Sequence, residues 1–198
     1  MAKADFANSF GCDIATLSDS CLKLITEYDW HYRPLTPAES EQMDRSIRRE
    51  IAAGIFPPAG TPEAKSRWER VWTDSLSALR KGLLGSLSPL YLKPAVVLRF
   101  YQKFIEPVDP FFETHWHRVL LRGVYENYLR NGKTLYEFGC GSGHNLVYLA
   151  SLDPSKTYWG LDWAASSVKI CQTLGTQGWN IRGRYFDLFT PDLCFELE

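Results

Sequence analysis

The chain has 198 residues, of which 45% are apolar and 14% aromatic, and its formal net charge is −1. This composition predicts a folded protein with one substantial core or one and a half domains, and the charge gives no long-range attraction to nucleic acid or to an anionic membrane. The N-terminus lacks a secretory signal pattern, no run approaches the ~18 apolar residues of a membrane-spanning helix, and the five cysteines form no C-x-x-C pair. We therefore expect a cytoplasmic protein with no disulfide framework and no metal site.

Three helices are predicted in the first part of the chain, at residues 13–28, 36–54 and 61–82. The second begins with Thr36-Pro37-Ala38-Glu39, which has the residue types of a capping box with proline at the first helical position. Apolar residues recur at helical spacing in each helix, and we expect them to be buried. They are Leu17, Cys21, Leu24 and Ile25; Met43, Ile47 and Ile51; and Trp68, Val71, Trp72, Leu76 and Leu79.

Pro107 and Pro110 mark the expected boundary between two regions. Residues 1–106 are predicted to form an α-helical N-terminal region, and residues 107–198 a second domain. That domain should open with an amphipathic helix at 111–130. Its expected apolar positions are Phe112, Trp116, Val119, Leu120 and Tyr128. The two histidines beside Trp116 are expected to be surface or core groups rather than catalysts.

The segment 134–145, TLYEFGCGSGHN, predicts a buried strand, a glycine loop and the start of a helix. Gly139, Gly141 and Gly143 allow the sharp turn from strand to helix and let a ligand approach the backbone. The N–H groups at the start of the helix then face that ligand. Glu137, near the end of the strand, is costly to bury unless it meets a cation or hydrogen-bond donors. A ligand with an ammonium group would supply both.

Two further strands are predicted after the glycine loop, and each is followed by an acid. Asp162 lies about 20 residues beyond the glycines, where doubly wound nucleotide folds place an acid that binds ribose hydroxyls. Trp163 is placed to stack on an adenine ring. Asp187 follows the last strand, next to Thr190, where a turn or helix-cap role is one interpretation. The expected elements are a helix at 145–151, a strand at 157–161, a helix at 164–176 and a strand at 181–186.

Glu137 and the three glycines resemble motif I of the class I S-adenosylmethionine-dependent methyltransferases, acid-x-Gly-x-Gly-x-Gly. The dehydrogenase motif Gly-x-Gly-x-x-Gly fails, because its third glycine would fall on His144. The resemblance implies a Rossmann-like α/β fold, and for Asp187 it implies a second interpretation, a hydrogen bond to the adenine amino group. The cofactor-binding residues that we expect are Glu137, Gly139, Cys140, Gly141, Gly143, His144, Asn145, Asp162, Trp163 and Asp187. Cys140 is expected to be a small filler rather than a nucleophile.

The function implied by the resemblance is transfer of a methyl group from S-adenosylmethionine to an O, N or C acceptor. The net charge favours a small-molecule acceptor over nucleic acid. Two alternatives stay open. An NAD(P)-dependent oxidoreductase would use Asp162 but gives Glu137 no role, and a non-catalytic binding module would use the helical N-terminal region to recruit a partner. The sequence assigns neither the catalytic residues nor the oligomeric state.

The resemblance covers only the first three strands of the family's domain, whose seven strands have the order 3-2-1-4-5-7-6. We therefore expect a domain truncated after its third strand. The chain alone should be inactive, because the loop after the fourth strand supplies the acceptor site. The strand at 134–138, which reads as buried on both faces, would become an edge strand. We expect this edge to self-associate, to be covered by another segment, or to leave the fold marginally stable.

Overall fold

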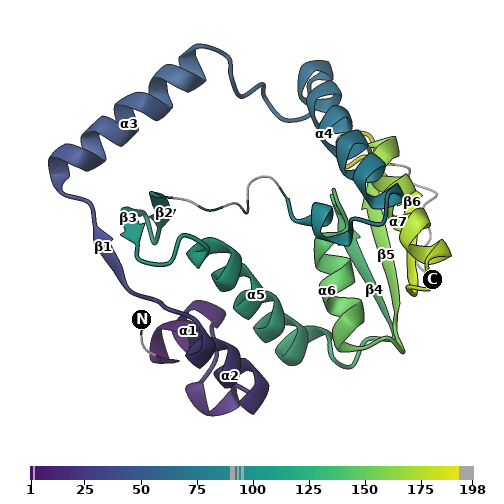
Figure 1. Ribbon diagram of the computed structural model, residues 1–198, viewed down its shortest axis with the longest axis horizontal. Coiled ribbons are helices and arrows are strands. Elements are labelled where there is room, and N and C mark those ends of the chain that lie inside the picture. Colours follow the sequence, from purple (N-terminus) through teal and green to yellow (C-terminus); the bar gives the residue numbers. More distant parts are fainter. Residues whose placement is uncertain (2, 90–91, 93, 95, 192–198) are drawn as a thin grey trace. The chain divides into compact units, whose positions relative to one another are not determined.

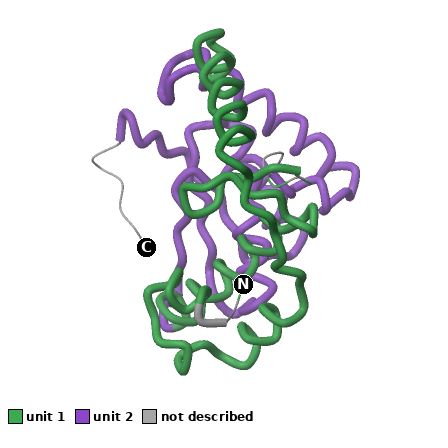
Figure 2. The backbone as a smooth tube through the Cα atoms, turned by 90° about the vertical axis from the view of Figure 1, so that its left-hand side faces the viewer, with its two compact units in different colours: residues 1–56, 90–130 green, residues 57–89, 131–198 purple. Residues whose placement is uncertain are grey.

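The computed structural model describes residues 1, 3–89, 92, 94 and 96–191. Its contacts divide the chain into two compact units, shown in Figure 2: unit 1 comprises residues 1–56 and 90–130, and unit 2 comprises residues 57–89 and 131–198. The chain therefore enters each unit twice, and the contacts do not follow the boundary expected near Pro107. No helix of the described residues is long and apolar enough to cross a membrane.

Unit 1 contains helices and a small antiparallel sheet (Figure 1). Its elements are α1 (Lys3–Phe10), η1 (Ile14–Thr16), α2 (Asp19–Glu27), β1 (Tyr32–Pro34), α3 (Pro37–Ala52), β2 (Leu98–Phe100), β3 (Lys103–Pro107), α5 (Phe112–Val124) and η3 (Tyr125–Leu129). The strand order is β1-β3-β2. The region over 1–106, expected to be α-helical, therefore also contributes short strands. Strands of three to five residues are too short for a clear alternating pattern in the sequence.

The turn between β2 and β3 is a tight two-residue hairpin turn. Phe100 pairs with Lys103, and the two residues between them, Tyr101 and Gln102, have φ of +45° and +65°. Positive φ at both central positions is the geometry whose twist matches that of the flanking strands. Residues other than glycine adopt it at some cost, so the pairing of the two strands outweighs the local preference of Tyr101.

The core of unit 1 lies where α1, α2 and α5 meet β3. Cys21 and Ile25 of α2 are buried as expected, and so are Phe112 and Val119 of α5. Tyr128, however, is 66% exposed. The reason is that α5 gives way to a π-helical turn, η3, whose wider winding rotates the side chains relative to the α-helical spacing. The buried residue of this turn is Tyr125.

The two histidines of α5 are both partly buried. His115 stacks on the ring of Tyr28, with centroids 3.8 Å apart, and its Nδ1 lies 2.8 Å from the Asp109 carboxylate. Burial lowers the pKa of His117. That these histidines are core groups rather than catalysts stays a prediction.

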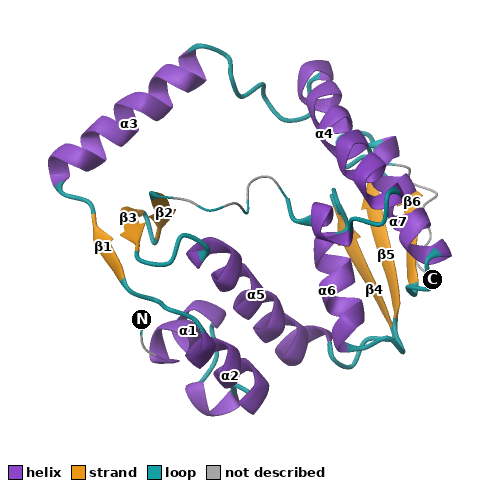
Figure 3. Cartoon of the chain, viewed as in Figure 1, coloured by secondary structure: helices purple, strands orange, loops and turns teal. Residues whose placement is uncertain are grey.

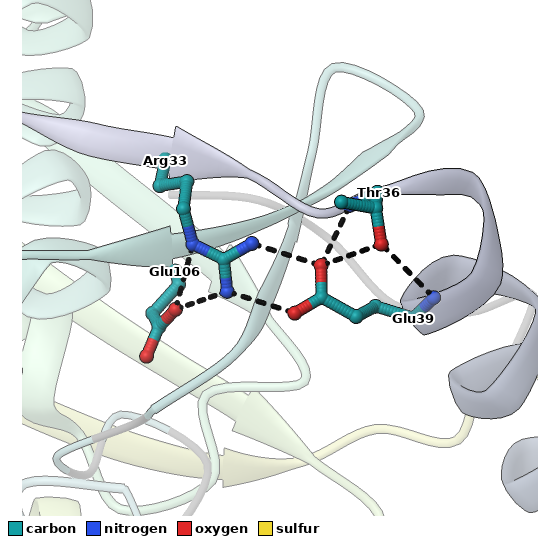
Figure 4. Close-up of polar contacts among 4 residues, drawn as sticks. All are labelled: Arg33, Thr36, Glu39 and Glu106. Atoms are coloured by element: carbon teal, nitrogen blue, oxygen red, sulfur yellow. Dashed lines mark hydrogen bonds and ion pairs between the residues drawn. The ribbon is translucent and has the colours of Figure 1, made fainter.

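The capping box of α3 is present as predicted. The Thr36 hydroxyl accepts a hydrogen bond from the backbone of Glu39, and the Glu39 carboxylate accepts one from the backbone of Thr36. Figure 4 shows that Arg33 of β1 bridges this box to the neighbouring strand, because its guanidinium donates to Glu39 at 2.8 Å and to Glu106 of β3 at 2.5 Å. The start of the helix is thereby tied to the sheet.

The apolar face of α3 is less buried than the sequence predicts. Met43 and Ile47 are half-buried, and Ile51 is 58% exposed. The helix contributes no fully buried residue, so its stability rests on its cap and its local contacts rather than on a core.

Unit 2 is built on a parallel sheet in which β5 lies between β4 and β6, as Figure 3 shows. Its elements are α4 (Pro62–Arg80), η2 (Leu84–Leu87), β4 (Thr134–Phe138), α6 (His144–Leu152), β5 (Thr157–Asp162), α7 (Ala165–Thr176) and β6 (Ile181–Tyr185). The predicted elements from β4 to β6 are confirmed to within about one residue at each end, whereas α4 ends two residues before its predicted end. Both crossovers run in the same direction, so the right-handed rule places α6 and α7 on one face of the sheet. The protein is thus of mixed α/β class.

One face of the sheet is buried and the other is partly open. Leu135, Tyr158 and Ile181 are neighbours across the three strands, and all are buried beneath the helices. On the opposite face Tyr136 is half-buried and Phe138 is 46% exposed. The expectation that the strand at 134–138 is buried on both faces is therefore wrong. Among the described residues this strand, β4, pairs only with β5 and so lies at an edge.

Candidate functional site

The glycine loop joins the carboxyl end of β4 to the start of α6. Gly139, Gly141 and Gly143 have φ of +73°, +51° and +70°, a region that other residues enter at a cost of about 1–2 kcal/mol. Gly143 is also the N-cap of α6, without a side-chain cap. The prediction that this turn needs glycine for its backbone conformation is confirmed. His144 is the first residue of the helix that follows.

Asp162 fastens the glycine loop to the end of β5. Its carboxylate accepts hydrogen bonds from the backbone N–H groups of Gly141 and Ala164, each at 2.8 Å, and the residue is only 3% exposed. Burial raises the pKa of Asp162, against the lowering effect of these hydrogen bonds. The acid expected to bind a ribose therefore also has a structural task in the unliganded protein, which the sequence did not indicate.

Glu137 is a buried carboxylate with one unsatisfied oxygen. Its Oε1 accepts a hydrogen bond from the Asn145 side chain at 2.6 Å. Its Oε2 is buried, and no donor among the described residues lies within hydrogen-bonding distance. Burial raises the pKa of Glu137 to about 7. An unpaired buried carboxylate is unfavourable, so this oxygen marks a place where an external donor or cation would be stabilising.

Asp187 is buried in the turn after β6. Its carboxylate accepts hydrogen bonds from the Phe189 backbone N–H at 3.0 Å and from the Thr190 hydroxyl at 3.1 Å, and it forms an ion pair with Lys65 of α4. The Lys65 ammonium and the turn donors lower its pKa. The turn interpretation of Asp187 is therefore confirmed, whereas the adenine interpretation stays a prediction.

The other residues predicted for the site differ in their surroundings. Cys140 is buried, with its Sγ 3.7 Å from the Sγ of Cys171, and this contact and burial raise its pKa. A Cβ on Gly160 would lie 2.8 Å from the Cys140 sulfur, so the thiol fills space above β5 and is not poised as a nucleophile. Trp163 is half-buried directly after Asp162.

Helix α4 covers this edge of the sheet, and the sequence did not predict its place there. The Trp72 ring packs on the glycine loop, since a Cβ on Gly141 would lie 2.8 Å from it. The Glu69 carboxylate accepts a hydrogen bond from the Ser166 N–H at 3.1 Å, which satisfies a donor at the first turn of α7. Of the apolar positions expected to be buried on this helix, Trp72, Leu76 and Leu79 are buried and Trp68 is 37% exposed, and their spacing did not indicate the element that the helix packs against.

Comparisons with known proteins leave the chain without a family. No family model matches the sequence, and no curated protein matches it. The geometry at the carboxyl ends of the three parallel strands is therefore the basis for assigning a function.

Proposed function

We propose that the protein binds S-adenosylmethionine at the carboxyl ends of β4, β5 and β6 and belongs to a methyltransferase. The observation that carries the proposal is Glu137. Its buried, unsatisfied Oε2 lies at the end of a strand, directly before a loop of three glycines with positive φ. The amino group of the cofactor's methionine part is a cation with several donors, and it would remove the cost of this buried charge.

The surrounding residues suit the rest of the same ligand. The three glycines bring no side chains of their own to the loop, on which only the Trp72 ring of α4 is seen to rest at Gly141, and Asp162 stands at the next strand end, where parallel α/β sheets bind nucleosides. Trp163, half-buried beside Asp162, offers an aromatic face for a base. When bound, S-adenosylmethionine supplies a sulfonium methyl group for in-line transfer to an O, N or C nucleophile, and the protein's part is to hold donor and acceptor in line.

Of the alternatives, an oxidoreductase is less well supported. A dinucleotide has no ammonium group to place against Glu137, and His144 begins α6 where the dehydrogenase loop has its third glycine. A binding module without catalysis is compatible with the same cofactor site and differs only in turnover.

Isothermal titration calorimetry with S-adenosylhomocysteine, NADH and NADPH tests the proposal. We expect heat of binding with S-adenosylhomocysteine alone, and weaker binding by Glu137→Gln, which keeps the shape of the side chain but loses its charge. Lys133→Met, a change of charge before β4 at the opposite end of the sheet, is the control and should bind like wild type. Binding of a nicotinamide nucleotide in preference to S-adenosylhomocysteine would overturn the proposal.

A further inference from the structure

The Lys65 ammonium lies near two aromatic rings at the edge where the base of a nucleoside would bind. Its Nζ is 5.8 Å from the centroid of the Trp163 ring and 6.0 Å from that of Phe189. Both distances are within the range of cation–π attraction. The same ammonium is paired with Asp187. Lys65 therefore has three partners in one small region, all supplied by the ends of β5 and β6.

Lys65 also covers the carboxylate of Asp187. The Asp187 side chain accepts from Lys65, Phe189 and Thr190, and it is almost fully buried in their midst. A base amino group that donates to this carboxylate would have to compete with the Lys65 ammonium and the two turn donors. By contrast, the Lys65 side chain is 31% exposed, so it can swing into solvent without unfolding the turn.

Two further contacts of α4 lie on the same side of the sheet. Glu69, one turn beyond Lys65, binds the N–H of Ser166 at the start of α7, and Trp72 rests on Gly141. The Trp72 ring thus occupies the space above the loop backbone that a ligand would need to approach. Three side chains hold helix α4 in place. Lys65 pairs with Asp187 after β6, Glu69 binds the start of α7, and Trp72 rests on the glycine loop.

We propose that Lys65 is a latch: in the unliganded protein its ammonium lies beside Trp163 and Phe189, where the adenine ring would bind, and the cofactor displaces it and loosens α4. This inference rests on the proposed function. If a ligand binds only the open state, its apparent affinity equals its intrinsic affinity multiplied by the fraction of molecules that are open. Removing the latch should therefore raise the affinity for the cofactor, although it removes a charge from the site.

The test uses the full chain and S-adenosylhomocysteine as the probe. Lys65→Met keeps the aliphatic stem and removes the ammonium, and we expect it to bind about three- to tenfold more tightly than wild type by calorimetry. Lys65→Arg keeps the charge and should bind within about twofold of wild type. Lys133→Met is the matched control for loss of one lysine and should leave the affinity unchanged.

Hydrogen exchange supplies a second measurement, which does not need turnover. Saturating S-adenosylhomocysteine should increase amide exchange in the first half of α4, residues 62–72, and Lys65→Met should increase it without ligand. Unchanged or weaker binding by Lys65→Met, or greater protection of α4 on binding, would overturn the latch. Absence of binding to wild type and to Lys65→Met would instead overturn the proposed function, so the two failures are distinguishable.

Discussion

The buried carboxyl of Glu137 makes the stability of the unliganded protein depend on pH. In the unfolded chain this group loses its proton near pH 4.5, whereas burial in the folded chain raises its pKa to about 7. Between these values the folded state holds more protons than the unfolded state, so the free energy of unfolding falls as the pH rises. A shift from 4.5 to about 7 corresponds to about 3 kcal/mol, which is present below pH 4.5 and lost by pH 7.

Glu137→Gln isolates this contribution, because the amide keeps the shape of the side chain and does not titrate. We expect the difference in unfolding free energy between the variant and wild type to grow by about 3 kcal/mol, in favour of the variant, from pH 4.5 to pH 7. Urea denaturation followed by circular dichroism, at half-unit pH steps, measures it. Stability curves that stay parallel over this window would refute the reasoning. S-adenosylhomocysteine should bind wild type more tightly as the pH rises through the same window.

Asp162→Ala should lower the free energy of unfolding by about 2–4 kcal/mol in urea melts and also weaken S-adenosylhomocysteine binding, because two buried N–H groups lose their acceptor; an unchanged melt would contradict this. Gly141→Ala should destabilise more than Gly139→Ala in thermal melts, since both positions have positive φ but only the methyl group at 141 meets the Trp72 ring. Equal losses would show that the ring moves aside freely. Finally, we expect the β4 edge to self-associate, and Phe138→Lys to weaken this in light scattering across a concentration series. A wild-type molar mass that stays that of a monomer at every concentration would contradict self-association through β4.

The region from β4 to β6 could be predicted from the sequence because its signals are local. Gly139, Gly141 and Gly143 are required by the backbone of the turn itself, Asp162 is the last residue of β5, and Asp187 follows β6 by two residues. Such features depend on neighbours within a few residues, so periodicity and turn chemistry identify them.

The contacts of α4 could not be predicted in the same way. Lys65 meets Asp187 across 122 positions of sequence, and Glu69 meets Ser166 across 97. The residues next to Lys65 or Glu69 in the sequence do not indicate such a distant partner. The spacing of Trp72, Leu76 and Leu79 shows that one side of the helix is buried, but any apolar surface would satisfy that pattern. The hydrogen bond from the Gly141 N–H to Asp162 could not be predicted from the sequence for a related reason, because Gly141 follows a different strand.

The interleaved order of the two units has a consequence for synthesis on the ribosome. Helix α4 is made before helix α7, on which it packs, and about 100 further residues are added before β6 is complete, which takes roughly 5–20 s at ordinary translation rates. Until α7 and the glycine loop have been made, the buried face of α4, with Trp72, Leu76 and Leu79, lacks these partners. A nascent chain stalled at this stage would expose the apolar, aromatic face of α4. Chaperones that bind exposed apolar segments should therefore bind α4 rather than the strands that are made later.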